Sequence, residues 1–239
     1  MRDALVFNGA SNLNFQDIRA NVIRIPEVVQ RIREAQAIWD KLSATPLDLT
    51  NFIGSEDETF LGHIKLKSFA TAVVQVGLLD RYLKNHKISE YVIGAVNGDS
   101  PLLVAIGEMT FEQLVSESLA LSPIPRRQPT ATTAQTPLGL PILSGVQLVE
   151  FAAFKRNPET GKYDRQASTM RELERMIVEL VDKDEVNRLI MVGPGSSVSG
   201  KRILDLTARD VQVQESIDLD PMLTWFWAKL RDTELAIAN

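Results

Sequence analysis

Three short apolar runs without regular polar alternation constrain the fold of this chain most strongly. They lie at 4–7, 91–96 and 188–192, and each leads into a glycine-containing turn. A strand that lacks alternation is buried on both faces, which requires helices on both sides of the sheet. Helical patterns at 26–42 and 66–83 lie between the first two runs. We therefore predict an α/β fold, with a mainly parallel central sheet flanked by helices.

The two long helical segments differ in how deeply they should be buried. Residues 26–42 place their apolar side chains on one stripe, and Pro26 suits the first turn of a helix. Residues 66–83 are apolar nearly all round, which is typical of a helix in the core.

Local signals place the remaining elements. Thr110 and Gln113 have the spacing of a capping box and predict a helix from Phe111. An amphipathic helix is predicted over 168–183, with Ser168 or Thr169 as its cap and with Met170, Leu173, Ile177 and Leu180 facing inward. We also expect a helical segment at 101–107, a strand at 142–156 and, after a turn, a return arm at 163–166. A strand at 211–219 and a helix at 220–236 end the predicted pattern.

A proline- and threonine-rich segment interrupts this pattern. Residues 122–141 hold five prolines and four threonines, which indicates an extended connection rather than part of the core. The chain shows no internal repeat. At 239 residues, we expect a single α/β domain over 1–239.

Composition excludes several classes of function. The net charge of -5 argues against nucleic acid as a partner, since phosphate binding needs a basic face. No cysteine is present, so disulfides and thiolate metal sites are excluded. The lack of disulfides fits a protein of the reducing cytoplasm. No signal peptide is visible and no apolar run reaches the roughly 18 residues of a membrane span. The acidic run 182–185 suits a solvated helix end rather than a metal site. Taken together, these features predict a cytoplasmic protein without metal or cofactor.

The turn after the third apolar run nearly matches a phosphate-binding loop. Gly195, Gly200 and Lys201 have its spacing, but Arg202 stands where a serine or threonine would hold magnesium. Only 38 residues follow Lys201, too few for the rest of a nucleotide-binding domain. The residues therefore favour a strand-to-helix turn that uses glycine for close packing.

The same turn resembles a motif of a known enzyme family. Residues 191–201, "MVGPGSSVSGK", resemble the "E-x-G-P-G-x-x-L-x-G" turn of malonyl-CoA:acyl-carrier-protein transacylases and polyketide synthase acyltransferase domains. Residues 4–11, "ALVFNGAS", resemble "FVFPGQGSQ", and 68–94 resemble "QPALFAVEYAL…G…PDYVAG". Residues 94–115, "GAVNGDSPLLVAIGEMTFEQLV", lie over "GHSLGEYAALVAAGVLSFEDAL", and "LPILSGV" resembles "IPVISNV". The order and spacing of these segments support the resemblance, which implies an α/β hydrolase-like core.

The nucleophile that the resemblance implies is missing. In that family the serine sits on a sharp G-x-S-x-G turn between strand and helix. Here the turn consists of Gly94, Ala95, Val96, Asn97 and Gly98. Valine has no atom that can attack a thioester, so this position cannot form an acyl-enzyme. No catalytic residue is therefore assigned.

The other parts of the catalytic machinery that the family implies are missing too. The only histidines are His63 and His86, both before the turn, whereas the family's base follows it. The oxyanion-hole glutamine falls on Ala10, and the malonyl-binding arginine has no counterpart. The small ferredoxin-like subdomain is replaced by 122–141. What the resemblance retains is a former cleft, with Gly9, Ala10, Gly193, Pro194 and Gly195 as candidate binding residues.

These residues leave three hypotheses open. The first is an inactive acyltransferase-like protein that binds an acyl-carrier protein, a partner enzyme or an acyl thioester such as acyl-CoA in fatty-acid or polyketide biosynthesis. The second is a divergent acyltransferase or thioesterase that uses Ser100 and His63. The third is a structural subunit of a homo-oligomer, to which the aromatic segment 225–227 could contribute interface, although a place in the core of a C-terminal helix explains that segment better.

Overall fold

The computed structural model describes most of the α/β core. The described residues are 2–7, 22–55, 64–95, 101–120, 151–170, 173–183, 185–193, 204–205, 207, 209–220 and 222. Their strands are β1 (Asp3–Val6), β2 (Tyr91–Ala95), β3 (Phe151–Arg156), β4 (Tyr163–Met170), β5 (Arg188–Met191) and β6 (Gln212–Glu215). Their helices are η1 (Val22–Arg24), α2 (Pro26–Leu42), α3 (Leu49–Gly54), α5 (Ile64–Asn85), α6 (Pro101–Ala105), α7 (Phe111–Ala120) and α8 (Leu173–Asp182).

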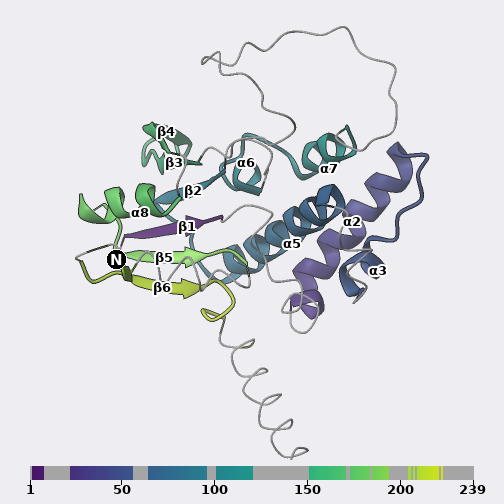
Figure 1. Ribbon diagram of the computed structural model, residues 1–239, viewed down its shortest axis with the longest axis horizontal. Coiled ribbons are helices and arrows are strands. Elements are labelled where there is room, and N and C mark those ends of the chain that lie inside the picture. The colour runs from purple at the N-terminus through teal and green to yellow at the C-terminus, as the bar shows by residue number, and fades with distance from the viewer. Residues whose placement is uncertain are drawn as a thin grey trace, which may run out of the picture.

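The strands form one sheet in the order β4-β3-β2-β1-β5-β6, which Figure 1 shows from top to bottom. β1 pairs in parallel with β2 and with β5, and β5 pairs in parallel with β6. β3 pairs antiparallel with both β2 and β4. The predicted α/β class is confirmed, and the described sheet is mixed.

Alternate side chains of the central strands enter two separate hydrophobic clusters. Leu5 of β1 joins a cluster formed with α2, α3, α5, α6 and α7. Val6, its neighbour in the sequence, joins a second cluster formed with α8. Val92 and Ile93 of β2 divide in the same way. The strands are therefore buried on both faces, as the lack of alternation predicted.

The larger cluster depends on close packing of α2 against α5. Trp39 of α2 stacks on Phe69 of α5 with ring centroids 5.5 Å apart. Elsewhere in the crossing, a Cβ atom added to Gly77 of α5 would lie 2.6 Å from the Cα atom of Val28. Glycine at this position is what allows the two helix backbones to approach so closely.

Several predicted boundaries are confirmed. α2 spans the predicted residues 26–42, and α5 extends the predicted 66–83 by two residues at each end. The capping box is present, because the backbone N–H of Thr110 donates to Gln113 Oε1 at 2.8 Å. The backbone N–H of Gln113 donates in return to Thr110 Oγ1 at 3.1 Å. The predicted hairpin is the antiparallel pair of β3 and β4.

The predicted start of the helix at 168–183 is wrong. β4 continues to Met170, where it pairs with Phe151, and Thr169 pairs with Ala152. Ser168, Thr169 and Met170 are therefore strand residues rather than helix caps or helix core. Pairing with β3 satisfies the backbone N–H and C=O groups of this segment, so the segment continues as a strand instead of starting a helix with a local cap. The helix itself is α8, and its predicted inward residues from Leu173 onward, Leu173, Ile177 and Leu180, are buried.

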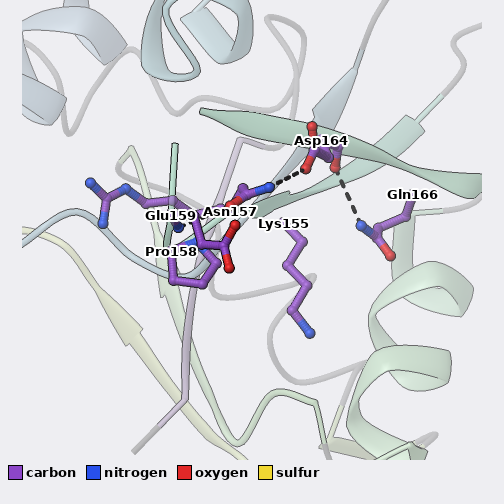
Figure 2. Close-up of a pocket in the computed structure, with 7 residues that line it drawn as sticks. Lys155, Asn157, Pro158, Glu159, Asp164 and Gln166 are labelled. Carbon is purple, nitrogen blue, oxygen red and sulfur yellow. Dashed lines mark hydrogen bonds between the residues drawn. The ribbon is translucent and has the colours of Figure 1, made fainter. Parts of the chain in front are cut away.

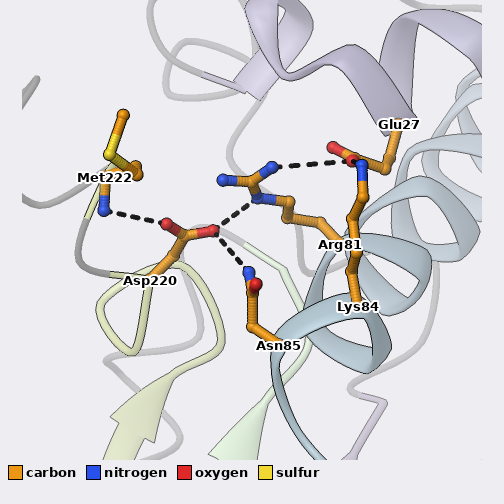
Figure 3. A network of polar contacts seen from close by, with 6 residues as sticks. All are labelled: Glu27, Arg81, Lys84, Asn85, Asp220 and Met222. Atoms are coloured by element: carbon orange, nitrogen blue, oxygen red, sulfur yellow. Dashed lines mark hydrogen bonds and ion pairs between the residues drawn. The ribbon is translucent and has the colours of Figure 1, made fainter.

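A buried carboxylate ties the segment after β6 to the end of α5. Figure 3 shows Asp220 accepting hydrogen bonds from the Arg81 guanidinium and from Asn85 Nδ2, the latter at 3.2 Å. Its other oxygen accepts from the backbone N–H of Met222 at 3.0 Å. The Asp220 side chain is only 5% exposed. This arrangement holds the described end of the chain against α5.

Arg81 also connects α5 to α2 through Glu27. The guanidinium lies 3.5 Å from Glu27 Oε1, which Lys84 approaches to 2.7 Å. Burial acts to raise the pKa of Glu27, but the hydrogen bond from Lys84 and the charge of Arg81 outweigh it, so this pKa lies below its usual value. The hydrogen bond to Asp220 raises the pKa of Arg81. Glu27 and Asp220 thus both favour the charged form of Arg81.

Some expected features lie outside the described residues. These are the connection 122–141 and, apart from Asp220 and Met222, the helix predicted at 220–236. Among the described helices, none is both long enough and apolar enough to cross a membrane.

Candidate functional site

The candidate site lies where three neighbouring parallel strands end. At this carboxyl edge the backbone N–H of Phe7 donates to Ile93 O at 2.8 Å, joining the ends of β1 and β2. The backbone N–H of Val192 donates to Val6 O at 2.9 Å, joining the ends of β5 and β1. Open α/β sheets bind ligands at this edge. The fold therefore brings Gly94 near the end of β2 and Gly193 just after β5 to one edge.

Gly94 permits a close approach that a larger residue would prevent. An added Cβ atom would lie 3.0 Å from Phe7 Cβ and 3.1 Å from Phe7 O. It would also lie 3.6 Å from Leu102 Cβ on α6, the helix that follows the predicted turn. The residue after β1 therefore approaches the Gly94 backbone closely, while Leu102 lies at an ordinary packing distance.

We expect Gly94→Ala to destabilise the protein by about 1 kcal/mol, because Phe7 or the β2 backbone must shift to admit the methyl group. Chemical denaturation should show a lower midpoint with an unchanged slope. Gly107→Ala is not a suitable control, since Gly107 has a φ of 78° and would be strained for another reason. An unchanged midpoint for Gly94→Ala would contradict the close-packing role.

Gly193 begins the turn after β5 in a conformation that favours glycine. Its φ is 135°, in a region that residues with a Cβ rarely adopt. The preceding carbonyl, Val192 O, accepts a hydrogen bond from Gln75 Nε2 of α5 at 3.0 Å. The buried Gln75 side chain therefore fixes the backbone position from which this turn starts.

Sequence reasoning missed the two buried polar residues of α5. Thr71 and Gln75 are both 0% exposed, and Thr71 Oγ1 and Gln75 Oε1 have no hydrogen-bond partner. Their four-residue spacing places them on one helix face. Two polar residues at this spacing in an otherwise apolar helix were the signal that could have identified them.

Most predicted site residues lie outside the described part of the chain. The described ones are Gly94, Gly193 and the backbone of Ala95. The others are Gly9, Ala10, His63, Val96, Asn97, Gly98, Ser100, Pro194 and Gly195. Their proximity to one another stays a prediction.

His86 lies at the opposite edge of the sheet from Gly94. It directly follows α5, and its ring stacks on Tyr82 with centroids 4.8 Å apart. Together with Asp3 and Arg188, the first residues of β1 and β5, it lines a pocket at the amino ends of these strands. His86 therefore cannot serve as a base for a reaction at the carboxyl edge.

The β3–β4 turn carries a second, open pocket of about 410 Å³ (Figure 2). Asn157 Nδ2 donates to Asp164 Oδ2 at 3.4 Å, and Gln166 Nε2 donates to the Asp164 carbonyl at 3.3 Å. Asn157 Oδ1 accepts from the backbone N–H of Glu159 at 2.9 Å. These polar groups stabilise the hairpin turn itself, and the pocket lies apart from the carboxyl edge.

The described residues contain no group of three or more histidine, aspartate or glutamate side chains placed to hold a metal ion. At this edge the described polar side chains include Gln75, which donates to Val192 O, and Ser216, whose backbone N–H donates to Met191 O at 2.9 Å and whose buried Oγ has no hydrogen-bond partner. Such an edge can bind and orient a polar group, and the described histidine, His86, lies at the other edge.

The sheet order, the close packing at Gly94 and the positive φ of Gly193 define the backbone of the carboxyl edge in this α/β fold. The malonyl-CoA–acyl carrier protein transacylase of Clostridium perfringens superposes with a TM-score of 0.53 at 13% identity, over 100% of both chains. An acyl carrier protein S-malonyltransferase of Vibrio cholerae gives the same TM-score at 14% identity, over 90% of this chain and 96% of that one. At these identities the similarity establishes the fold.

Other matches are partial. A malonyl-CoA:ACP transacylase of Synechocystis matches with a TM-score of 0.40 and 18% identity, over 49% of this chain. This match spans 38% of the Synechocystis structure. A second match, to the MCAT structure of Streptococcus pneumoniae, spans 36% of that structure. No protein-family profile and no curated protein matches the sequence.

Proposed function

We propose that this chain is a degenerate member of the malonyl-CoA:acyl-carrier-protein transacylase and polyketide acyltransferase family that binds without transferring acyl groups. One observation carries this proposal. Gly94 of β2 is packed too closely against Phe7 for a larger side chain, while the residue at the family's nucleophile position in the sequence is Val96. The scaffold is retained and the reacting atom is absent.

The position of the histidines supports the same conclusion. The sequence contains two, and His86 lies at the opposite edge of the sheet from Gly94. No histidine follows the turn in the sequence. Activation of a hydroxyl nucleophile depends on such an adjacent base.

The bound partner is an acyl-carrier protein, a partner enzyme or an acyl thioester in fatty-acid or polyketide biosynthesis. The solved proteins that share this fold are named as malonyl transferases that act with acyl carrier protein. We propose that the single domain is cytoplasmic, that it needs no cofactor, and that 122–141 replaces the small subdomain. Exposed cleft surface without that subdomain favours association with a partner or a second copy.

Incubation with malonyl-CoA tests this proposal directly. We expect intact-mass spectrometry to show no acyl adduct, under conditions in which an active transacylase forms one. Calorimetric titration with malonyl-CoA and with holo-acyl-carrier protein measures binding in the same samples. A stable adduct on any residue would contradict the proposal, and so would the absence of binding to both probes.

We further expect Val96→Ser to remain inactive. The substitution restores a hydroxyl but no general base, and an unactivated serine is a weak nucleophile at neutral pH. Transfer of malonyl groups to acyl-carrier protein should stay at the background rate of the unsubstituted chain. A clear gain of transfer by this single substitution would show that a base is already present.

The alternative is a divergent acyltransferase or thioesterase that uses Ser100 and His63. It predicts turnover of at least one acyl-CoA across a chain-length panel, and loss of that turnover in Ser100→Ala. The absence of turnover across the panel eliminates this alternative.

A further inference from the structure

A polar pocket of about 220 Å³ lies at the amino ends of the central parallel strands. We call it the amino-edge pocket. Its walls come from the segment after α5 and from the first residues of β1 and β5, and they include Asp3, His86, Lys87, Ser89, Glu90 and Arg188. It shares no residue with the candidate acyltransferase site, which lies at the other edge of the sheet.

Two buried polar atoms of this pocket have no hydrogen-bond partner. Ser89 is 4% exposed and its Oγ is unpaired, and His86 Nε2 is also buried and unpaired. Burial raises the pKa of the Tyr82 phenol, so this third polar group beside the pocket stays protonated at neutral pH. Buried polar atoms without a partner are costly, so two at one pocket indicate a missing partner molecule.

The pocket holds these groups in fixed positions. Tyr163 Oη donates to the carbonyl oxygen of Ser89 at 2.6 Å, which attaches the Ser89 backbone to β4. The His86 ring stacks on Tyr82 at an interplanar angle of 20°. A ligand that contacts Ser89 and His86 would therefore meet groups that are already oriented.

Arg188 supplies hydrogen-bond donors beyond those that it already uses. Its Nε donates to Asp3 Oδ1 at 2.9 Å, and its Nη2 donates to Asp3 Oδ2. These bonds use two of the five N–H donors of a guanidinium. They also engage both carboxylate oxygens of Asp3, so the two charges offset each other and Arg188 contributes hydrogen-bond donors rather than net positive charge.

The remaining charges also favour an acceptor ligand. Glu90 is the other carboxylate of the wall, and Lys155 lies 3.8 Å from it. Lys87 adds an ammonium group to the wall. We infer that the amino-edge pocket binds a small oxyanion, a carboxylate or a phosphate group, through Ser89, His86 and Arg188. Ser89 Oγ donates, Arg188 donates, and His86 Nε2 donates in the tautomer that carries its proton there.

The test is a titration of isotope-labelled protein with inorganic phosphate and, separately, with acetate, followed by NMR. We expect saturable shifts of the Ser89 amide and the His86 ring signals, and the tighter of the two probes identifies the class of anion. Ser89→Ala removes the hydroxyl that would donate to the anion and should weaken binding by about tenfold. His86→Phe keeps the stacking on Tyr82 and should weaken binding as well.

Ser116→Ala is the matched control, because this exposed hydroxyl of α7 bonds only to its own helix, at Glu112 O. It should leave both titrations unchanged. The inference would be overturned if neither anion gives a saturable titration. It would also be overturned if the Ser89→Ala and His86→Phe variants bind the anion as tightly as the unsubstituted protein does. Neither result bears on acyl binding, since Val96 and Gly94 play no part in this pocket.

Discussion

Gly77→Ala is expected to destabilise the protein by at least about 2 kcal/mol. The added Cβ would lie 2.6 Å from the Cα atom of Val28, so α2 and α5 must separate. Overpacking of this kind costs about 1–3 kcal/mol, and more where backbone atoms collide. Alanine gains roughly 1 kcal/mol over glycine in helix propensity, and the net loss is expected despite that gain. Thermal unfolding should show a melting temperature lower by roughly 5 °C or more.

Gly54→Ala is the control for this prediction. Gly54 is the last residue of α3, and an added Cβ would meet nothing within 4 Å. The same substitution should therefore be neutral or slightly stabilising there. Equal effects at Gly54 and Gly77 would show that the loss does not come from the α2–α5 contact.

Asp220→Ala is expected to cost about 3 kcal/mol. It removes the buried acceptor of Arg81 and Asn85 and leaves the Arg81 guanidinium, 19% exposed, with Glu27 alone. Breaking a buried ion pair by removing one partner is costly because the remaining charge is poorly solvated. Urea denaturation should show the loss as a lower midpoint.

Asp40→Ala is the matched control, because Asp40 lies on the exposed face of α2, where Gln36 Nε2 donates to it at 2.7 Å. The change in stability there should stay within about 0.5 kcal/mol. Arg81→Ala in the Asp220→Ala background should cost much less than Arg81→Ala alone. Additive losses would show that the two side chains do not act as a pair.

The helices that sequence predicted well are those whose signals are local. The stripe from Val28 to Trp39 and the Pro26 start define α2, and Thr110 with Gln113 defines the start of α7. Where pairing with a distant strand decides the structure, local signals mislead. Thr169 has the chemistry of a helix cap, yet it lies in β4, where its backbone pairs with Ala152 of β3.

The candidate site could be predicted only in its backbone requirements. The sequence predicts that glycine is needed at 94 and 193. In the structure, Gly94 allows a close approach of Phe7, and Gly193 has a positive φ. The partner of Val192 O was not predictable, because Gln75 is 117 residues away and reads in sequence as a member of a core helix. The amino-edge pocket escaped prediction for the same reason, since Asp3 and Arg188 meet only through strand pairing.

The place of β1 in the sheet has a consequence for how the chain is synthesised. β1 is made long before one of its neighbours, β5, which begins at Arg188. Until that segment leaves the ribosome, the backbone edge of β1 that pairs with β5 stays unpaired. Such edges invite pairing with other chains, and contacts between distant segments form slowly. Nascent chains that stall before residue 188 should therefore depend on chaperones more than completed ones do.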